Sequence, residues 1–159
     1  MKHPRGITLL EMLVVMALVS LMVGISFPAV SAGLESLRLR SASDEVVSFL
    51  YTGLTFAERR EQVMELRISR ATNELSFRNA AGDFHRTLTL PEAVTISHIE
   101  PMPAGEQAAE ASIMLYPGGS FPRVSIELTN RRGAQRVVRI DPVSGTPVSE
   151  VPAPPAEAK

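Results

Sequence analysis

The chain has 159 residues, a formal net charge of −1, and 45% hydrophobic residues. This length leaves room for one domain of modest size, and the nearly balanced charge gives no general argument for a nucleic-acid partner. The chain contains no cysteine, which excludes disulfide bonds, thiolate metal sites and thiol catalysis.

The amino terminus combines a short basic leader with an apolar run long enough to cross a bilayer. The leader, residues 1–6, ends at Gly6, and the run over residues 7–27 contains one charged residue, Glu11. About 20 residues of helix cross the roughly 30 Å hydrocarbon core. A carboxylate inside such a span costs on the order of 2.5–3.5 kcal/mol, so Glu11 is predicted to need a partner. If the chain is cut after Gly6, the new amine of Ile7 on a neighbouring copy is a candidate.

This pattern resembles the class III signal of type IV pilins and of type II secretion pseudopilins. In that family a prepilin peptidase cuts after the glycine and methylates the new amine, and the fifth mature residue is a glutamate. The resemblance implies cleavage between Gly6 and Ile7, N-methylation of Ile7 and a role for Glu11 in assembly. Ile7 departs from the family, which most often has phenylalanine there. The implied location is the bacterial inner membrane, crossed once, with the carboxyl-terminal head in the periplasm.

A secretory signal peptide that is removed is the alternative interpretation of the amino terminus. Its cleavage site would follow the small residues at 30–32. The apolar run is longer than the roughly 7–15 residues of a signal-peptide core, and it contains Glu11. We therefore expect a retained transmembrane helix over residues 7–30.

The helix is predicted to continue into a head domain, residues 31–146. Between about residues 34 and 61, apolar residues recur at steps of three and four, as in an amphipathic helix with one face on a core. They are Leu39, Ala42, Val46, Phe49 or Leu50, Gly53 and Ala57. A glycine inside a helix costs about 1 kcal/mol relative to alanine, so Gly53 is expected to mark close packing against a sheet.

From about residue 63 to residue 141 the hydrophobic period changes from 3.6 to 2, which predicts half-buried strands. Examples are Met64, Leu66 and Ile68, then Val94 and Ile96, and later Val124, Ile126 and Leu128. Short turns without helical patterns between the strands predict antiparallel pairing. The predicted fold class is therefore α+β, a long amino-terminal helix packed on antiparallel β-sheet. Residues 147–159 contain four prolines and are predicted to be a disordered tail.

Later segments resemble the H-type minor pseudopilins (GspH) and the related minor pilin FimT. These segments are residues 41–60, 63–66, 116–120 and 138–145. The resemblance implies a type IV pilin-like fold and a structural subunit at or near the tip of the periplasmic pseudopilus, which drives export of folded proteins across the outer membrane. The implied partners are other pseudopilins, the prepilin peptidase and the inner membrane. The major pseudopilin is disfavoured, because its calcium loop needs several oxygen ligands and the last acidic residues are scattered.

No catalytic residue, metal site or cofactor is predicted, and we expect the chain not to be an enzyme. The histidines His3, His85 and His98 are isolated in the sequence. Asp83 lies near His85, but no nucleophile accompanies them.

A cluster of arginines makes DNA binding the alternative function. Its members are Arg131, Arg132, Arg136 and Arg139, with Arg123 nearby and only Glu127 opposing them over residues 123–139. Phosphate contacts of this kind give salt-dependent, sequence-independent binding. No aromatic residue is interleaved for base stacking. The resemblance to FimT implies that such binding would serve natural transformation; we favour secretion.

Overall fold

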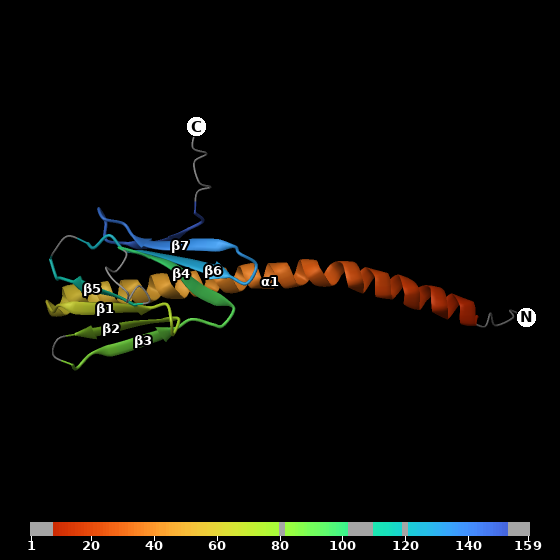
Figure 1. Cartoon of the computed structure of the whole chain (residues 1–159), viewed down its shortest axis with the longest axis horizontal. Helices are drawn as coiled ribbons and strands as arrows, with labels where there is room; N and C mark the ends of the chain where they lie inside the picture. Colours follow the sequence, from red (N-terminus) through yellow and green to blue (C-terminus); the bar gives the residue numbers. More distant parts are fainter. Residues whose placement is uncertain (1–7, 80–81, 102–109, 119–120, 153–159) are drawn as a thin grey trace, which may run out of the picture. The chain divides into compact units, whose positions relative to one another are not determined.

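The computed structural model describes residues 8–79, 82–101, 110–118 and 121–152. The chain divides into two compact units, residues 1–34 and 35–159. The described residues form one long α-helix and eight β-strands (Figure 1). Their bounds are α1 Leu9–Arg60, β1 Met64–Ser69, β2 Glu74–Asn79, β3 His85–Thr89, β4 Val94–Glu100, β5 Glu110–Leu115, β6 Ser125–Asn130, β7 Gln135–Ile140 and β8 Pro147–Glu150.

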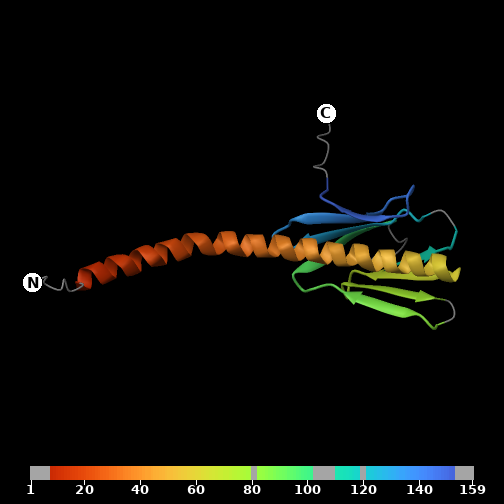
Figure 2. The same cartoon turned by 180° about the vertical axis from the view of Figure 1, so that it is seen from behind.

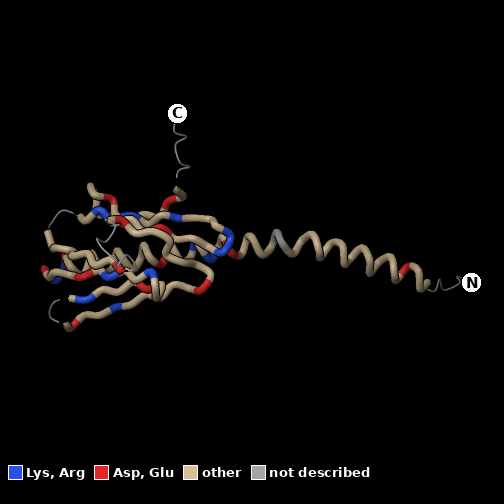
Figure 3. Tube along the Cα trace, in the orientation of Figure 1, with Lys and Arg blue, Asp and Glu red and all other residues tan. Residues whose placement is uncertain are grey.

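The amino-terminal part of α1 has the composition of a membrane helix. Its large apolar side chains are exposed, among them Leu10 at 73%, Met16 at 67% and Phe27 at 73%. Figure 3 shows this part of the helix almost free of charged residues. By length and composition, α1 is sufficient to cross a membrane.

The carboxyl-terminal part of α1 is the central helix of the head. It lies across both sheets, as Figure 1 and Figure 2 show from opposite sides. The face predicted from the periodicity is the buried one: Leu39, Ala42, Val46, Leu50, Gly53 and Ala57 are buried, and Leu54 adds to them. The prediction of an amphipathic half-helix is therefore confirmed.

Gly53 marks a close approach of the helix to the sheet, as predicted. A Cβ built on Gly53 would lie 2.3 Å from ring atoms of Phe77, whose side chain is almost completely buried. The ring of Phe77 also stacks on Phe49, with 4.9 Å between the ring centroids. Only a residue without a side chain leaves room for the aromatic ring at this point of α1.

The strands form two antiparallel four-stranded sheets, in the orders β3-β2-β1-β5 and β4-β6-β7-β8. The predicted α+β class and antiparallel pairing are confirmed. Alternating apolar residues of both sheets share one core with α1, for example Leu66 and Ile68 from β1 and Ile126 and Leu128 from β6. The two-residue hydrophobic period predicts strands but does not show how they are grouped. The division into two sheets was therefore not predicted from the sequence.

Asn73 joins the two sheets. It occupies the β1–β2 turn with a φ of 57°, a left-handed conformation that asparagine tolerates. Its side-chain nitrogen donates to the carbonyl of Val94 at 2.6 Å, and its side-chain oxygen accepts from the amide of Ile96 at 3.0 Å. One side chain therefore attaches the first sheet to β4 of the second.

The prediction of a disordered tail over residues 147–159 is wrong at its start. Residues Pro147–Glu150 form β8, which pairs with β7 at the edge of the second sheet. Proline cannot donate a ladder hydrogen bond, but it is tolerated at the first residue of an edge strand, where Pro147 lies buried. Residues 153–159 lie outside the described part of the chain.

Candidate functional site

The helix α1 begins with a side-chain cap. The Oγ1 of Thr8 accepts a hydrogen bond from the amide of Glu11 at 3.2 Å, and the carbonyl of Thr8 accepts from the amide of Met12. Thr8 is therefore the N-cap, and Glu11 is the third residue of the helix. A threonine followed three residues later by a glutamate is the capping-box signature, a signal in the sequence that marks where the helix begins.

Glu11 lies in the first turn of α1, where the helix dipole favours a negative charge. Its side chain is exposed, and the apolar side chains around it, such as Leu10 and Leu13, are exposed as well. Among the described residues the Glu11 carboxylate has no hydrogen bond or ion pair. The cap binds the backbone amide of Glu11, and the helix dipole favours its negative charge. Neither occupies the carboxylate, which therefore remains available to another molecule.

Gly6 and Ile7, the predicted processing site, lie outside the described residues. Cleavage after Gly6 and methylation of the Ile7 amine therefore remain predictions. Thr8 is the first described residue, so the described chain begins one residue after the predicted mature terminus.

The four arginines of the predicted DNA-binding cluster have partners that come from elsewhere in the chain. Arg132 Nε lies 3.2 Å from Glu35 Oε2, and Arg131 lies 4.0 Å from a carboxylate oxygen of Glu92. Arg136 donates to Ser149 Oγ at 2.9 Å. Arg139 donates to both carboxylate oxygens of Glu150, at 3.2 and 2.8 Å. The hydrogen bonds and charge of Glu150 raise the pKa of Arg139.

These arginines also do not share one surface. Successive side chains of a strand point to opposite faces, so Arg136 and Arg139 of β7 lie on opposite faces of the second sheet. Arg131 and Arg132 belong to the turn between β6 and β7, which Asn130 closes by accepting from the amides of Arg132 and Ala134. The charge count along residues 123–139 missed Glu35, Glu92 and Glu150, because only the fold brings them close.

The described residues show no constellation for catalysis or metal binding. They contain no group of three or more His, Asp or Glu side chains that could hold a metal ion. His85 is exposed on the edge strand β3, and His98 Nε2 lies 3.6 Å from Glu100 Oε1. Asp83, near His85 in the sequence, contacts the side-chain amide of Asn79 instead.

Comparison with known proteins agrees with the amino-terminal signal and with the fold of the head. Residues 1–27 match the family described as the prokaryotic N-terminal methylation motif. Among solved structures, the chain is similar to the minor pseudopilin EpsH from the Type 2 Secretion System of Vibrio cholerae, with a TM-score of 0.56 and 16% sequence identity. The match covers 74% of this chain and 99% of that chain. None of the curated proteins matches the sequence. The chain therefore carries a prepilin-type methylation motif and has a minor-pseudopilin fold.

Proposed function

We propose that the chain is a minor pseudopilin of type II secretion, a structural subunit at or near the tip of the periplasmic pseudopilus. The observation that carries this proposal is the combination of two independent features in one chain. Residues 1–27 match the N-terminal methylation motif, and the fold is that of a minor pseudopilin. The motif alone is shared by filament subunits of several kinds, whereas the fold of the head favours a minor pseudopilin among them.

In this proposal the prepilin peptidase cuts after Gly6 and methylates Ile7. The mature chain is held in the inner membrane by α1, with the head in the periplasm, until it joins the filament. The exposed apolar side chains at the start of α1 support this location, because a large exposed apolar surface is unfavourable in water.

Glu11 directs assembly in this proposal. A carboxylate near hydrocarbon costs on the order of 2.5–3.5 kcal/mol, and the Ile7 amine of a neighbouring subunit would supply the opposite charge. In a medium of low dielectric constant such a pair attracts strongly, and its value lies in fixing the register between subunits.

The test is incorporation into filaments when the full chain is co-expressed with its partner pseudopilins. We expect Glu11→Leu to be inserted and processed but to be at least about tenfold depleted from sheared filaments, since about 1.4 kcal/mol of lost pairing suffices for that. Ser20→Leu is the matched control, because it adds apolar surface to the same span without removing a charge. Normal incorporation of the Glu11 variant would leave this residue without an assembly role.

DNA binding, as implied by the resemblance to FimT, is the alternative function. The intramolecular partners of the arginines and their division between two sheet faces weigh against one phosphate-binding patch. A fragment of residues 31–159, which contains the head, should therefore not retain duplex DNA at low salt. Retention that falls steeply with salt, and that is lost when Arg131 and Arg132 are both changed to Gln, would favour the alternative.

A further inference from the structure

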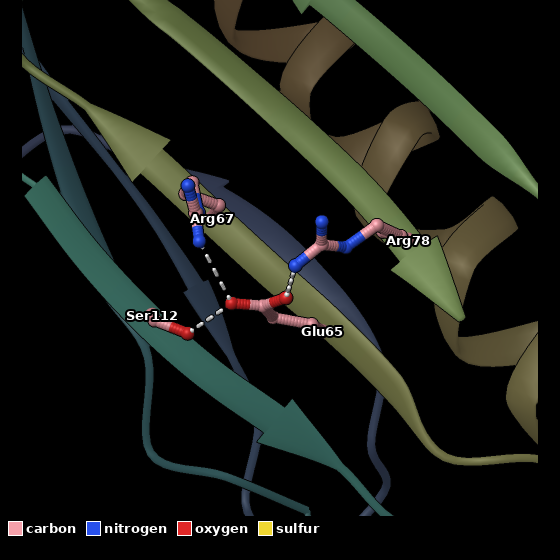
Figure 4. A network of polar contacts seen from close by, with 4 residues as sticks. All are labelled: Glu65, Arg67, Arg78 and Ser112. Carbon is pink, nitrogen blue, oxygen red and sulfur yellow. Dashed lines mark hydrogen bonds and ion pairs between the residues drawn. The ribbon is translucent and has the colours of Figure 1, made fainter. Parts of the chain in front are cut away.

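The outer face of the first sheet carries a charged network that the proposed function does not use. Glu65 of β1 lies at its centre, with its side chain 16% exposed. Its Oε2 accepts from Arg78 of β2 at 2.8 Å, and its Oε1 accepts from Ser112 of β5 at 2.8 Å and from Arg67 at 3.4 Å (Figure 4). Side chains from three strands therefore donate hydrogen bonds to the Glu65 carboxylate.

The two arginines retain most of their hydrogen-bonding capacity. A guanidinium has five N–H donors, and among the described residues Arg67 and Arg78 each use one, to Glu65. Their side chains are 51% and 59% exposed. Two positive charges lie beside the Glu65 carboxylate, and the carboxylates of Glu74 and Glu110 lie further along the same face. His85, which is paired with Arg78 in the sheet register, lies on the same face.

A partly apolar recess lies beside the network. Its volume is about 360 Å³, and it is lined by Val63, Glu65, Arg78, Asn79, Gly82 and Met114. Met114 is paired with Glu65 in the register, and its side chain is 48% exposed. We call Glu65, Arg67, Arg78 and Met114 the arginine face. It offers guanidinium donors and an exposed apolar side chain next to each other.

We propose that the arginine face binds a segment of a neighbouring filament subunit that carries a carboxylate beside an apolar side chain. This inference rests on the proposed function, since it needs a neighbouring subunit. Arginine forks bind carboxylates with two parallel hydrogen bonds. Glu65 already holds both guanidiniums in place, so less side-chain entropy is lost on binding. A DNA backbone fits this face less well than a single carboxylate, because a row of phosphates would also meet Glu74 and Glu110 and because the recess wall is partly apolar.

A photo-cross-linker in the assembled filament tests the proposal directly. Ser76 of β2 is paired with Arg67 in the register and lies on the same face, so it is the position for p-benzoylphenylalanine. We expect a cross-link to a neighbouring subunit, mapped by mass spectrometry to a segment with Asp or Glu next to an apolar residue. The same cross-linker at Arg86, which is exposed on β3 but paired with the inward-facing Phe77, should not give this product. A product with nucleic acid, or none from Ser76, would overturn the proposal.

Charge removal gives a second, quantitative readout. The double variant Arg67→Gln/Arg78→Gln should be about tenfold depleted from sheared filaments, and Arg86→Gln is the matched control that should be incorporated normally. Normal incorporation of the double variant would overturn the binding role proposed for the arginine face while leaving the proposed function intact. Absence of the unmodified chain from filaments would instead contradict the proposed function. If the double variant does not accumulate in cells, the cross-link from Ser76 decides.

Discussion

At the scale of single residues, Gly53 permits the ring of Phe77 to pack directly against the backbone of α1. Gly53→Ala would place a Cβ 2.3 Å from that ring, so Phe77 and its stacking partner Phe49 must shift. Overpacking costs about 1–3 kcal/mol, partly offset by about 1 kcal/mol of improved helix propensity. We expect a net destabilisation of up to about 2 kcal/mol in urea unfolding of residues 31–159, a fragment that contains the buried core of the described residues.

The control for this prediction is Gly33→Ala in the same fragment. A Cβ at Gly33 has no neighbour within 4 Å, so the change should be neutral or stabilising by up to about 1 kcal/mol. Equal effects of the two substitutions would mean that the contact with Phe77 is not the reason for a glycine at position 53.

The hydrogen bonds of Glu65 make the stability of the head depend on pH. Hydrogen bonds from Ser112 and Arg78 lower the pKa of Glu65 from 4.5 to about 2. Between these values the unfolded chain binds more protons at this site than the folded chain, so stability rises with pH. The contribution is complete above about pH 5 and is lost as the pH falls towards 2.

Glu65→Gln should therefore lower the free energy of unfolding by on the order of 1 kcal/mol at pH 7, since water screens the half-exposed arginines. The difference from the unmodified head should shrink as the pH is lowered from 5 to about 2. Urea unfolding at several pH values measures it. A difference that does not change over this pH range would show that Glu65 stabilises the head without its charge.

Single residues also differ in how far the sequence alone could predict their roles. The close packing at Gly53 was predictable, because a glycine on the apolar face of a helix leaves room for a neighbouring side chain that a Cβ would exclude. The partners of Glu65, Arg132 and Arg139 were not, because they depend on strand register and on contacts between distant segments. Charge counted along the chain therefore overestimated the positive patch at the arginines.

At the scale of elements, the start of α1 depends on the hydroxyl of Thr8. Thr8→Val keeps the shape of the side chain but removes the acceptor for the Glu11 amide, which costs about 1 kcal/mol at an N-cap. We expect hydrogen exchange of the Glu11 amide to become roughly fivefold faster in lipid nanodiscs, while Thr8→Ser retains the slow rate. Identical exchange in the Val and Ser variants would mean that the cap does not stabilise the first turn.

The strand β8 is the element that hydrophobic periodicity did not predict, and truncation tests its contribution. Ending the head after residue 146 removes β8, the buried Pro147 and the carboxylate that pairs with Arg139. We expect a loss on the order of 1–2 kcal/mol, which lowers the Tm by roughly 5–10 °C in a domain of this size. Ending the head after residue 151 keeps β8 and should leave the Tm nearly unchanged. Equal Tm values for the two truncations would show that β8 is not needed for stability.

At the scale of the whole molecule, hydrophobic periodicity was sufficient to predict a long helix followed by antiparallel strands. The step from a 3.6-residue to a 2-residue period near residue 63 coincides with the end of α1 at Arg60 and the start of β1 at Met64. The assignment of strands to two sheets was not predictable, because β5 returns to pair with β1 after β4 has joined the other sheet. The edge strand β8 was missed because prolines surround it.

The two units of the molecule carry complementary parts of the functional account. The amino-terminal unit carries the methylation motif, and the fold of the head matches that of a minor pseudopilin. Under the proposed function, the chain is processed, held in a membrane and then built into a filament. Assembly into the filament, through the pair with Glu11, depends on the new amino terminus at Ile7.

Mass spectrometry of the amino-terminal peptide of the chain, expressed with its prepilin peptidase, is therefore the most direct test. We expect a mature protein that begins at Ile7 and carries one methyl group on its amine. A Gly6→Ala variant should be cut less well, because its Cβ obstructs the backbone next to the scissile bond. A mature terminus at Gly33 would identify a removed signal peptide, and an intact leader in the presence of the active peptidase would also contradict the account.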